Sequence, residues 1–259
     1  MKPLMTSLLF VCATKVQVCG PNLEAAIRDV IEGYKEAILK SDLGGLTQLQ
    51  AKSKNITNLN GVEHCTNLQG LFLSGNRITD ISPLSNMTKL RRLELHANQI
   101  SDTSPLGRMT LMKDLNLTGN QITDVSPLSN LTNLQTLYLD GNQISDITPL
   151  SSLTNLRQLY LDHNRITNIS SLKALTKVGG SGGFWVREGI SVHLGLSNNQ
   201  ISDISPLVHN SGIGKGDGVD LRKNPLNDEA HDVHIPTLIE RGVKVLFDPK
   251  PEEGGKPES

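Results

Sequence analysis

A pattern of 22 residues recurs along most of this 259-residue chain, and no other feature limits its fold so strongly. Successive rows of the pattern start at Leu46, Leu68, Leu90, Met112, Leu134 and Leu156. Apolar residues recur at places 1, 4, 6, 11, 14, 17 and 20, which in the fifth row are Leu134, Leu137, Leu139, Ile144, Ile147, Leu150 and Leu153. One row buries too few aliphatic side chains to offset the conformational entropy that its ordering costs. The rows must therefore stack on one another.

Places 3 to 7 alternate between outward and inward side chains, as in Thr136 to Asp140, and this alternation predicts a short strand. Place 9 is asparagine in the second to sixth rows, and the looser later rows continue the series; these residues are Asn76, Asn98, Asn120, Asn142, Asn164, Asn199 and Asn224. Their side chains can hydrogen-bond to the backbone of the bend after each strand, so they should form a structural ladder.

The combined spacing, L-x-x-L-x-L-x-x-N-x-L, is the signature of leucine-rich repeats. It predicts an α/β solenoid, namely a curved, right-handed leucine-rich repeat array. Short parallel strands should line its concave face, with turns and 3-10 segments on the convex side.

The array is expected to span residues 46–226 in about eight rows, with an insertion at residues 178–193. Residues 21–45 should form a helical N-terminal cap. Its helix is expected over residues 21–38, with Asn22 as N-cap and with Leu23, Ile27, Val30 and Ile31 on its apolar face. Residues 227–247 should add a C-terminal cap made of a helical segment and a final strand. The Pro-, Gly- and Glu-rich residues 248–259 are expected to be a disordered tail.

The first 20 residues contain one short apolar run and resemble a weak or truncated secretory signal. They predict a secreted or cell-surface protein, and a cytoplasmic one if this segment is not a signal. No other segment is expected to cross a membrane.

The net charge of -1 disfavours nucleic acid as a partner, because such binding requires a clustered positive field. The three cysteines do not form a disulfide framework, and Cys65 is expected in the core.

The consensus of the rows, "NQISDISPLSNLTNL", resembles the 22-residue repeats of bacterial internalins. The opening "PNLEAAIRDVI" and the closing "VDLRKNPLND" resemble the segments that flank such arrays, so the resemblance covers about Pro21 to Phe247. It implies a non-enzymatic recognition or adhesion module that binds a protein ligand on its concave sheet. The printed sequence shows neither an immunoglobulin-like domain after the array nor a cell-wall anchoring motif, so host-cell invasion is not carried over.

The fold leaves the outward places of the strands free to vary, so they are the candidate binding residues. We expect partner contacts from Tyr138, Tyr160, Asp140, Asp162, His163, Phe72, Arg92, Glu94 and His96. Two of the three tyrosines occupy neighbouring rows at place 5, and amphipathic rings flanked by charges are typical of binding hot spots. Phe184 and Trp185 in the insertion are a possible second contact loop. We expect no cofactor, no metal and a monomer.

The sequence offers weak support for several other functions. The stretch around Ser181 satisfies G-x-S-x-G but lacks the strand and helix of a nucleophile elbow, so a hydrolase is the least favoured function. His231 and His234 could share a helix face, but no third zinc ligand is evident. The aspartates before the convex turns suit local turn hydrogen bonds better than calcium. A closer alternative is an intracellular regulatory or scaffold subunit, since some phosphatase-binding proteins also use 22-residue repeats.

Overall fold

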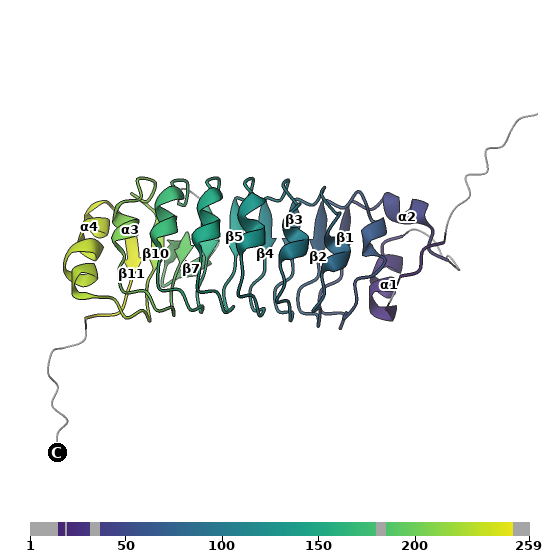
Figure 1. The fold of residues 1–259 in the computed structure, drawn as a ribbon, viewed down its shortest axis with the longest axis horizontal. Coiled ribbons are helices and arrows are strands. Elements are labelled where there is room, and N and C mark those ends of the chain that lie inside the picture. Colours follow the sequence, from purple (N-terminus) through teal and green to yellow (C-terminus); the bar gives the residue numbers. More distant parts are fainter. Residues whose placement is uncertain (1–14, 19, 32–36, 180–184, 251–259) are drawn as a thin grey trace, which may run out of the picture.

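The stacked rows form an elongated solenoid in the computed structural model, with one cap at each end (Figure 1). The structure describes residues 15–18, 20–31, 37–179 and 185–250. Ser181 and Phe184 lie outside these ranges. Within them, nine strands form one parallel sheet, in the order β1-β2-β3-β4-β5-β6-β9-β10-β11.

Each row contributes one short strand to this sheet. The strands are β1 (Gln48–Gln50), β2 (Gly70–Phe72), β3 (Arg92–Glu94), β4 (Asp114–Asn116), β5 (Thr136–Tyr138), β6 (Gln158–Tyr160), β9 (Leu194–Gly195), β10 (Gly218–Asp220) and β11 (Lys244–Leu246). From β1 to β6 the register advances by one row at every step, so Leu71 pairs with Leu93 and Leu93 pairs with Leu115. Equal places of successive rows therefore lie side by side, which confirms the predicted solenoid. The inward leucines form one continuous core.

The convex side consists mainly of 3-10 helices, as the Ser-Pro turns predict. They include Ser82–Leu84, Ser104–Leu106, Ser126–Asn130, Thr148–Ser152 and Ser170–Ala174. An aspartate caps most of these turns: the Oδ1 atom of Asp124 accepts a hydrogen bond of 2.8 Å from the backbone N–H of Ser126. Asp80, Asp102, Asp146 and Asp203 do the same in their rows. These carboxylates are used in local turns.

The place-9 asparagines connect each row to the row before it. The Nδ2 group of Asn142 donates to the carbonyl oxygens of Leu117 and Leu139, at 3.1 and 2.9 Å. Its Oδ1 atom accepts a hydrogen bond of 3.0 Å from the backbone N–H of Ile122. Equivalent bonds are made by Asn76, Asn98, Asn120, Asn164, Asn199 and Asn224. The backbone groups that lie beyond the strand ends are thereby satisfied.

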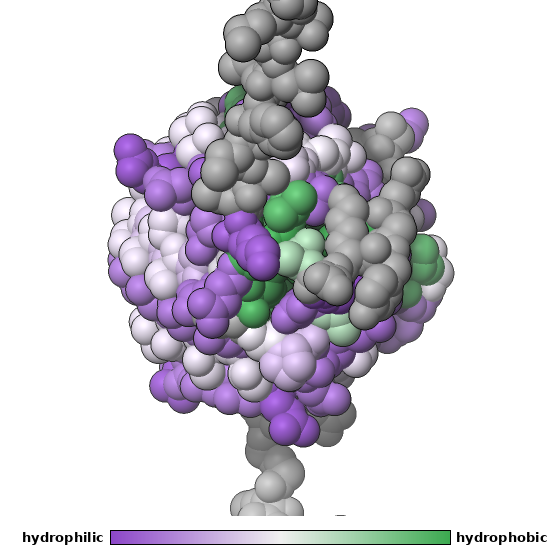
Figure 2. Space-filling view, turned by 90° about the vertical axis from the view of Figure 1, so that its right-hand side faces the viewer, coloured by the Kyte–Doolittle hydropathy of each residue, from purple (hydrophilic) through white to green (hydrophobic). Residues whose placement is uncertain are grey.

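The N-terminal cap differs from the predicted single helix. Helix α1 covers Pro21–Arg28, and a second short helix, α2, covers Lys40–Gly44. The N-cap of α1 is Gly20, and the prediction of Asn22 at this position is wrong, because the Asn22 side chain donates instead to the carbonyl oxygen of Asn55. Leu23 and Ile27 are buried against the array, whereas Val30 is 40% exposed because it lies beyond the helix end. Figure 2 views this end of the molecule and shows a largely hydrophilic surface with a small apolar area.

The C-terminal cap contains a π-helical turn over Ala230–His234, helix α4 (Ile235–Glu240) and strand β11. A short helix, α3 (Ser205–Val208), replaces the 3-10 segment of the preceding row. No helix in the described ranges has both the length and the apolar character needed to span a membrane.

The insertion folds into a two-stranded antiparallel hairpin of β7 (Trp185–Arg187) and β8 (Ile190–Val192). The array continues around it, because β6 pairs directly with β9 in parallel register. The hairpin thus interrupts the chain but not the sheet.

Candidate functional site

The hairpin lies over the concave face and covers its C-terminal part. The Tyr160 side chain is fully buried, and its hydroxyl donates a hydrogen bond of 2.8 Å to the carbonyl oxygen of Val192 in β8. Asp162 is 1% exposed. The prediction that Tyr160 and Asp162 are available to a partner is therefore wrong, because a segment distant from them in sequence occupies that surface.

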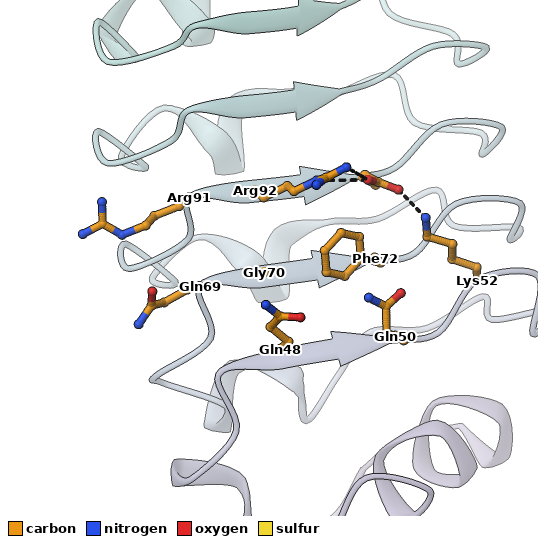
Figure 3. Close-up of a pocket in the computed structure, with 9 residues that line it drawn as sticks. Gln48, Gln50, Lys52, Gln69, Gly70, Phe72, Arg91 and Arg92 are labelled. Atoms are coloured by element: carbon orange, nitrogen blue, oxygen red, sulfur yellow. Dashed lines mark hydrogen bonds and ion pairs between the residues drawn. The ribbon is translucent and has the colours of Figure 1, made fainter. Parts of the chain in front are cut away.

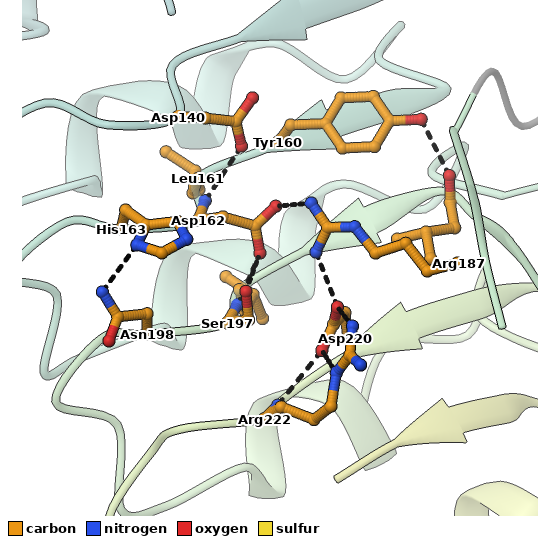
Figure 4. A network of polar contacts seen from close by, with 12 residues as sticks. Asp140, Tyr160, Leu161, Asp162, His163, Arg187, Ser197, Asn198, Asp220 and Arg222 are labelled. Atoms are coloured by element: carbon orange, nitrogen blue, oxygen red, sulfur yellow. Dashed lines mark hydrogen bonds and ion pairs between the residues drawn. The ribbon is translucent and has the colours of Figure 1, made fainter. Parts of the chain in front are cut away.

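Arg187 fastens the hairpin to the sheet (Figure 4). Its two terminal nitrogens bind Asp162 Oδ2 at 2.7 Å and Asp220 Oδ2 at 2.6 Å. Both carboxylates are buried, so each requires a cation or hydrogen-bond donors. Arg222 supplies a second cation to Asp220, and Ser197 donates its backbone N–H and its hydroxyl to Asp162. The contact between the hairpin and the sheet is thus a network in which each buried charge has a partner of opposite charge or a hydrogen bond.

Gly218 makes room for the hairpin, and Gly195 makes room for the Asp162 side chain that binds it. A Cβ atom at Gly218 would lie 2.1 Å from the backbone oxygen of Ser191, and one at Gly195 would lie 2.3 Å from Asp162 Oδ2. Both glycines stand at outward places of their strands. The other rows carry a side chain at the place of Gly195, whereas the place of Gly218 is also a glycine, Gly70, in the second row. Gly195 and Asp220, at a place that otherwise carries other side chains, were the sequence signal for a covering segment, and sequence reasoning missed it together with Arg187.

Tyr138 marks the border between the covered and the open parts of the face. Its ring stacks on that of Tyr160, with centroids 4.9 Å apart and planes 2° from parallel. The Tyr138 side chain itself is half-buried. Burial first, and then the negative charges of Asp114 and Asp140, raise the pKa of Tyr138 to about 12.

Asp140 lies beside Asp162 at the same border. Its Oδ1 atom accepts a hydrogen bond of 3.1 Å from the backbone N–H of Asp162, and its Oδ2 atom accepts one of 3.3 Å from the Thr118 hydroxyl. Burial and the neighbouring Asp162 carboxylate raise the pKa of Asp140 to about 7, although Arg187 opposes this shift. Exposed His163 lies on the far side of the pair, with its Nδ1 atom 2.7 Å from Nδ2 of Asn198.

The other expected contact residues lie on β2 and β3 (Figure 3). Two cations lie over the Phe72 ring: the Lys52 ammonium is 5.2 Å and the Arg92 guanidinium 5.4 Å from the ring centroid. Both cations bind Glu94, so Phe72 and Glu94 are only 7% and 8% exposed. Burial raises the pKa of Glu94, but the hydrogen bonds and charges of Lys52 and Arg92 outweigh it and lower the pKa overall. Direct contact with the Phe72 ring was wrongly expected, because its neighbours cover it.

Two adjoining hollows form what we call the open groove, which runs from β1 to β5. One is about 570 Å³ and includes Gln48, Gly70 and Arg91 in its lining; the other is about 670 Å³ and includes His96, Asp114 and Tyr138. Lys52, Arg92 and Glu94 border both hollows. The half-buried His96 has a buried Nδ1 atom without a partner in the described ranges, and burial lowers its pKa.

The remaining candidates lie outside this groove or cannot be placed. For Trp185, the structure describes only the backbone of β7. His231 and His234 lie in the C-terminal cap, and the described residues contain no group of three or more His, Cys, Asp or Glu that could hold a metal ion.

Comparisons with known proteins agree with this architecture. The family model of leucine-rich repeats in two copies matches residues 66–108, 110–152 and 132–174. The chain is similar to the structure of internalin C2 from Listeria monocytogenes, with 33% identity, coverage of 89% of this chain and 94% of that one, and a TM-score of 0.76.

The internalin inlF of the same species is 29% identical, with a TM-score of 0.74 and coverage of 88% of this chain. The chain spans 63% of the length of that structure. A leucine-rich repeat protein of Leptospira interrogans shares the fold at 21% identity, 74% and 52% coverage, and a TM-score of 0.56. No curated protein sequence gives a significant match. On the similarity to internalin C2 and the matching repeats, this chain belongs to the internalin-like leucine-rich repeat proteins.

Proposed function

We propose that this chain is a non-enzymatic recognition module that binds a protein ligand in the open groove. The observation that carries the proposal is the division of the concave face by the hairpin. Where the hairpin lies, the outward residues Tyr160, Asp162 and Asp220 are buried and hydrogen-bonded. Between β1 and β5 the groove keeps the Tyr138 ring, amides such as Gln48 and Asn116, and charges such as Arg92 and Asp114 at least partly exposed at its surface.

The groove is shorter than a fully open concave face would be. Five strands with four gaps span about 19 Å at the usual spacing of parallel strands. A partner that lies along the groove must therefore contact the rims as well if the interface is to reach a standard size. The rim beside the strand starts offers exposed Arg91, Lys113 and Arg157.

Capture of ligands by the immobilised full chain tests the proposal. Wild type would be compared with Asn116→Arg, which fills the centre of the groove, and with Asn130→Arg, which makes the same change on the convex side. We expect a protein from the native host that wild type and Asn130→Arg retain and that Asn116→Arg loses.

Equal retention by all three proteins would exclude the groove as the binding site. If no specific protein is retained from either culture medium or lysate, the proposed function itself is wrong. Labelling of wild type, but not of Ser181→Ala, by an active-site serine probe would instead point to a hydrolase.

We further propose a secreted or cell-surface location, which rests on the apolar run in the first 20 residues and on membership of the internalin-like proteins. N-terminal sequencing of the protein from the native host's medium should find a chain that starts after this segment. Recovery of the unprocessed chain from the cytoplasm alone would contradict the location and favour an intracellular scaffold.

A further inference from the structure

We infer that the groove recognises a cationic side chain, arginine or lysine, which a protein partner places against the open face of the Tyr138 ring between Asp114 and Asp140. This inference rests on the proposed function and names the chemistry that the partner must present. We call the position the Tyr138 subsite.

The stacking of the two tyrosines leaves one face of Tyr138 open. The ring centroids are 4.9 Å apart, close to the spacing of neighbouring strands, so the rings stack along the direction in which the strands succeed one another. One face of Tyr138 is therefore covered by Tyr160. The opposite face looks toward β4, where the residue in register is the smaller Asn116. The larger of the two hollows opens at this place.

Carboxylates flank this ring on both sides along the strand direction. Asp114 stands in register with Thr136, two residues before Tyr138, and Asp140 follows Tyr138 by two residues. Both line the hollow, and both act electrostatically on the Tyr138 hydroxyl. An aromatic face beside carboxylates attracts a cation through the ring quadrupole and through charge.

The cations already present in the hollow do not fill this role. Lys52 and Arg92 both bind Glu94, which lies two rows nearer the N-terminus than Tyr138. Arg187 binds Asp162 and Asp220 beneath the hairpin. Within the described ranges, Asp114 has no ion pair of 4.0 Å or less, and its side chain is half-buried at the groove wall. The subsite therefore has the negative charge of Asp114, joined by that of Asp140 as pH rises through about 7, which a partner can neutralise.

The occupant is expected to be an arginine or lysine rather than a free cation. No group of three or more His, Cys, Asp or Glu side chains that could hold a metal ion occurs among the described residues. A flat guanidinium can lie on the ring while its edge donates to a carboxylate.

Titration of the full-length protein with short capped peptides tests the inference, with the backbone and tyrosine signals followed by NMR. The probe is acetyl-Gly-Arg-Gly-amide. Its matched control contains citrulline, which keeps the shape of arginine but has no charge. We expect the arginine peptide to shift the signals of Tyr138 and Asn116 and to bind at least about 5-fold more tightly than the citrulline peptide, a ratio within the range of cation–π contacts.

Two variants separate the ring from the charge. Tyr138→Leu removes the ring and should weaken arginine binding about 5- to 10-fold, while Tyr138→Phe should retain most of it. Asp114→Asn should weaken binding about 3-fold, and Asp146→Asn, a matched change on the convex side, should leave it unchanged. The asparagine variants keep the test valid if Tyr138→Leu is poorly folded.

Equal binding of the arginine and citrulline peptides, or equal effects of Asp114→Asn and Asp146→Asn, would overturn the subsite. So would peptide-induced shifts confined to the Gly70 and Arg91 end of the groove. None of these results would affect the capture experiment. A captured protein that wild type and Asn130→Arg retain and only Asn116→Arg fails to retain would still support the groove as the binding site. Conversely, if the peptide binds at Tyr138 but no protein is captured, the cation subsite is supported and the proposed recognition function is wrong.

Discussion

The hydroxyl of Tyr160 donates to the carbonyl oxygen of Val192 across 32 positions of sequence, and this bond joins the last strand before the insertion to the inserted hairpin. Val192 is fully buried there and packs with Tyr160 and Leu246 in a small apolar cluster of its own. A ring that a regular array would expose becomes part of a second core. The concave face is consequently divided into a closed part and an open groove.

Tyr160→Phe should lower the free energy of unfolding by about 1–2 kcal/mol, because the buried carbonyl oxygen of Val192 loses its donor. Tyr138→Phe is the matched control, since no hydrogen bond from the Tyr138 hydroxyl is found in the part of the chain that the structure describes. Its effect should stay within about 0.5 kcal/mol. Urea denaturation measures both, and similar losses in the two variants would argue against the role of the Val192 bond.

Arg187→Ala should destabilise the protein by about 3 kcal/mol, because Asp162 would remain buried without its cation. Arg157 is exposed and makes no ion pair within the described ranges, so Arg157→Ala should change the free energy of unfolding by less than about 0.5 kcal/mol. Adding Asp162→Asn to Arg187→Ala should restore part of the loss, because it removes the uncompensated charge. If the double variant is less stable than Arg187→Ala alone, packing of the arginine stem matters more than its charge.

Asn142→Ala should lower the free energy of unfolding by about 3 kcal/mol or more. The reason is that two carbonyl oxygens and one backbone N–H in the interior lose their hydrogen-bond partner together. Asn133→Ala is the matched control on the surface of the same array, where a single exposed bond to the Thr110 carbonyl is lost. Its cost should be below about 1 kcal/mol. Comparable denaturation midpoints would show that the asparagine ladder is not a main source of stability.

The pKa of Asp140, raised to about 7, makes part of the stability depend on pH. The unfolded chain releases this proton near pH 4, whereas the folded protein holds it until about pH 7. The contribution of Asp140 is thus fully present below about pH 4 and is lost as pH rises through 7. Asp140→Asn removes this dependence, so its stability relative to wild type should increase between about pH 4 and pH 7 and then level off. A constant difference in unfolding free energy across this range would contradict the raised pKa.

The repeat predicted the architecture because each of its requirements is local or concerns adjacent rows. Apolar places such as Leu137 and Leu159 meet because they are one row apart, and Asn142 finds its partners in its own row and the one before. The Ser-Pro turns likewise begin 3-10 helices within a few residues of their capping aspartates. Helix α1 was predicted too long, because the pattern Leu23, Ile27, Val30, Ile31 continues beyond the last helical residue, Arg28.

The sequence alone determined a stack of equal rows with one outward face, since equal spacing of aliphatic residues permits no other way of burying them. Only the tertiary structure decided which outward residues remain available. Arg187 reaches Asp162 and Asp220 from 25 and 33 positions away, and no periodicity encodes such contacts. The two carboxylates can be buried because Arg187 neutralises them, and these ion pairs hold the hairpin against the sheet. The hairpin then covers Tyr160 and leaves one face of Tyr138 open.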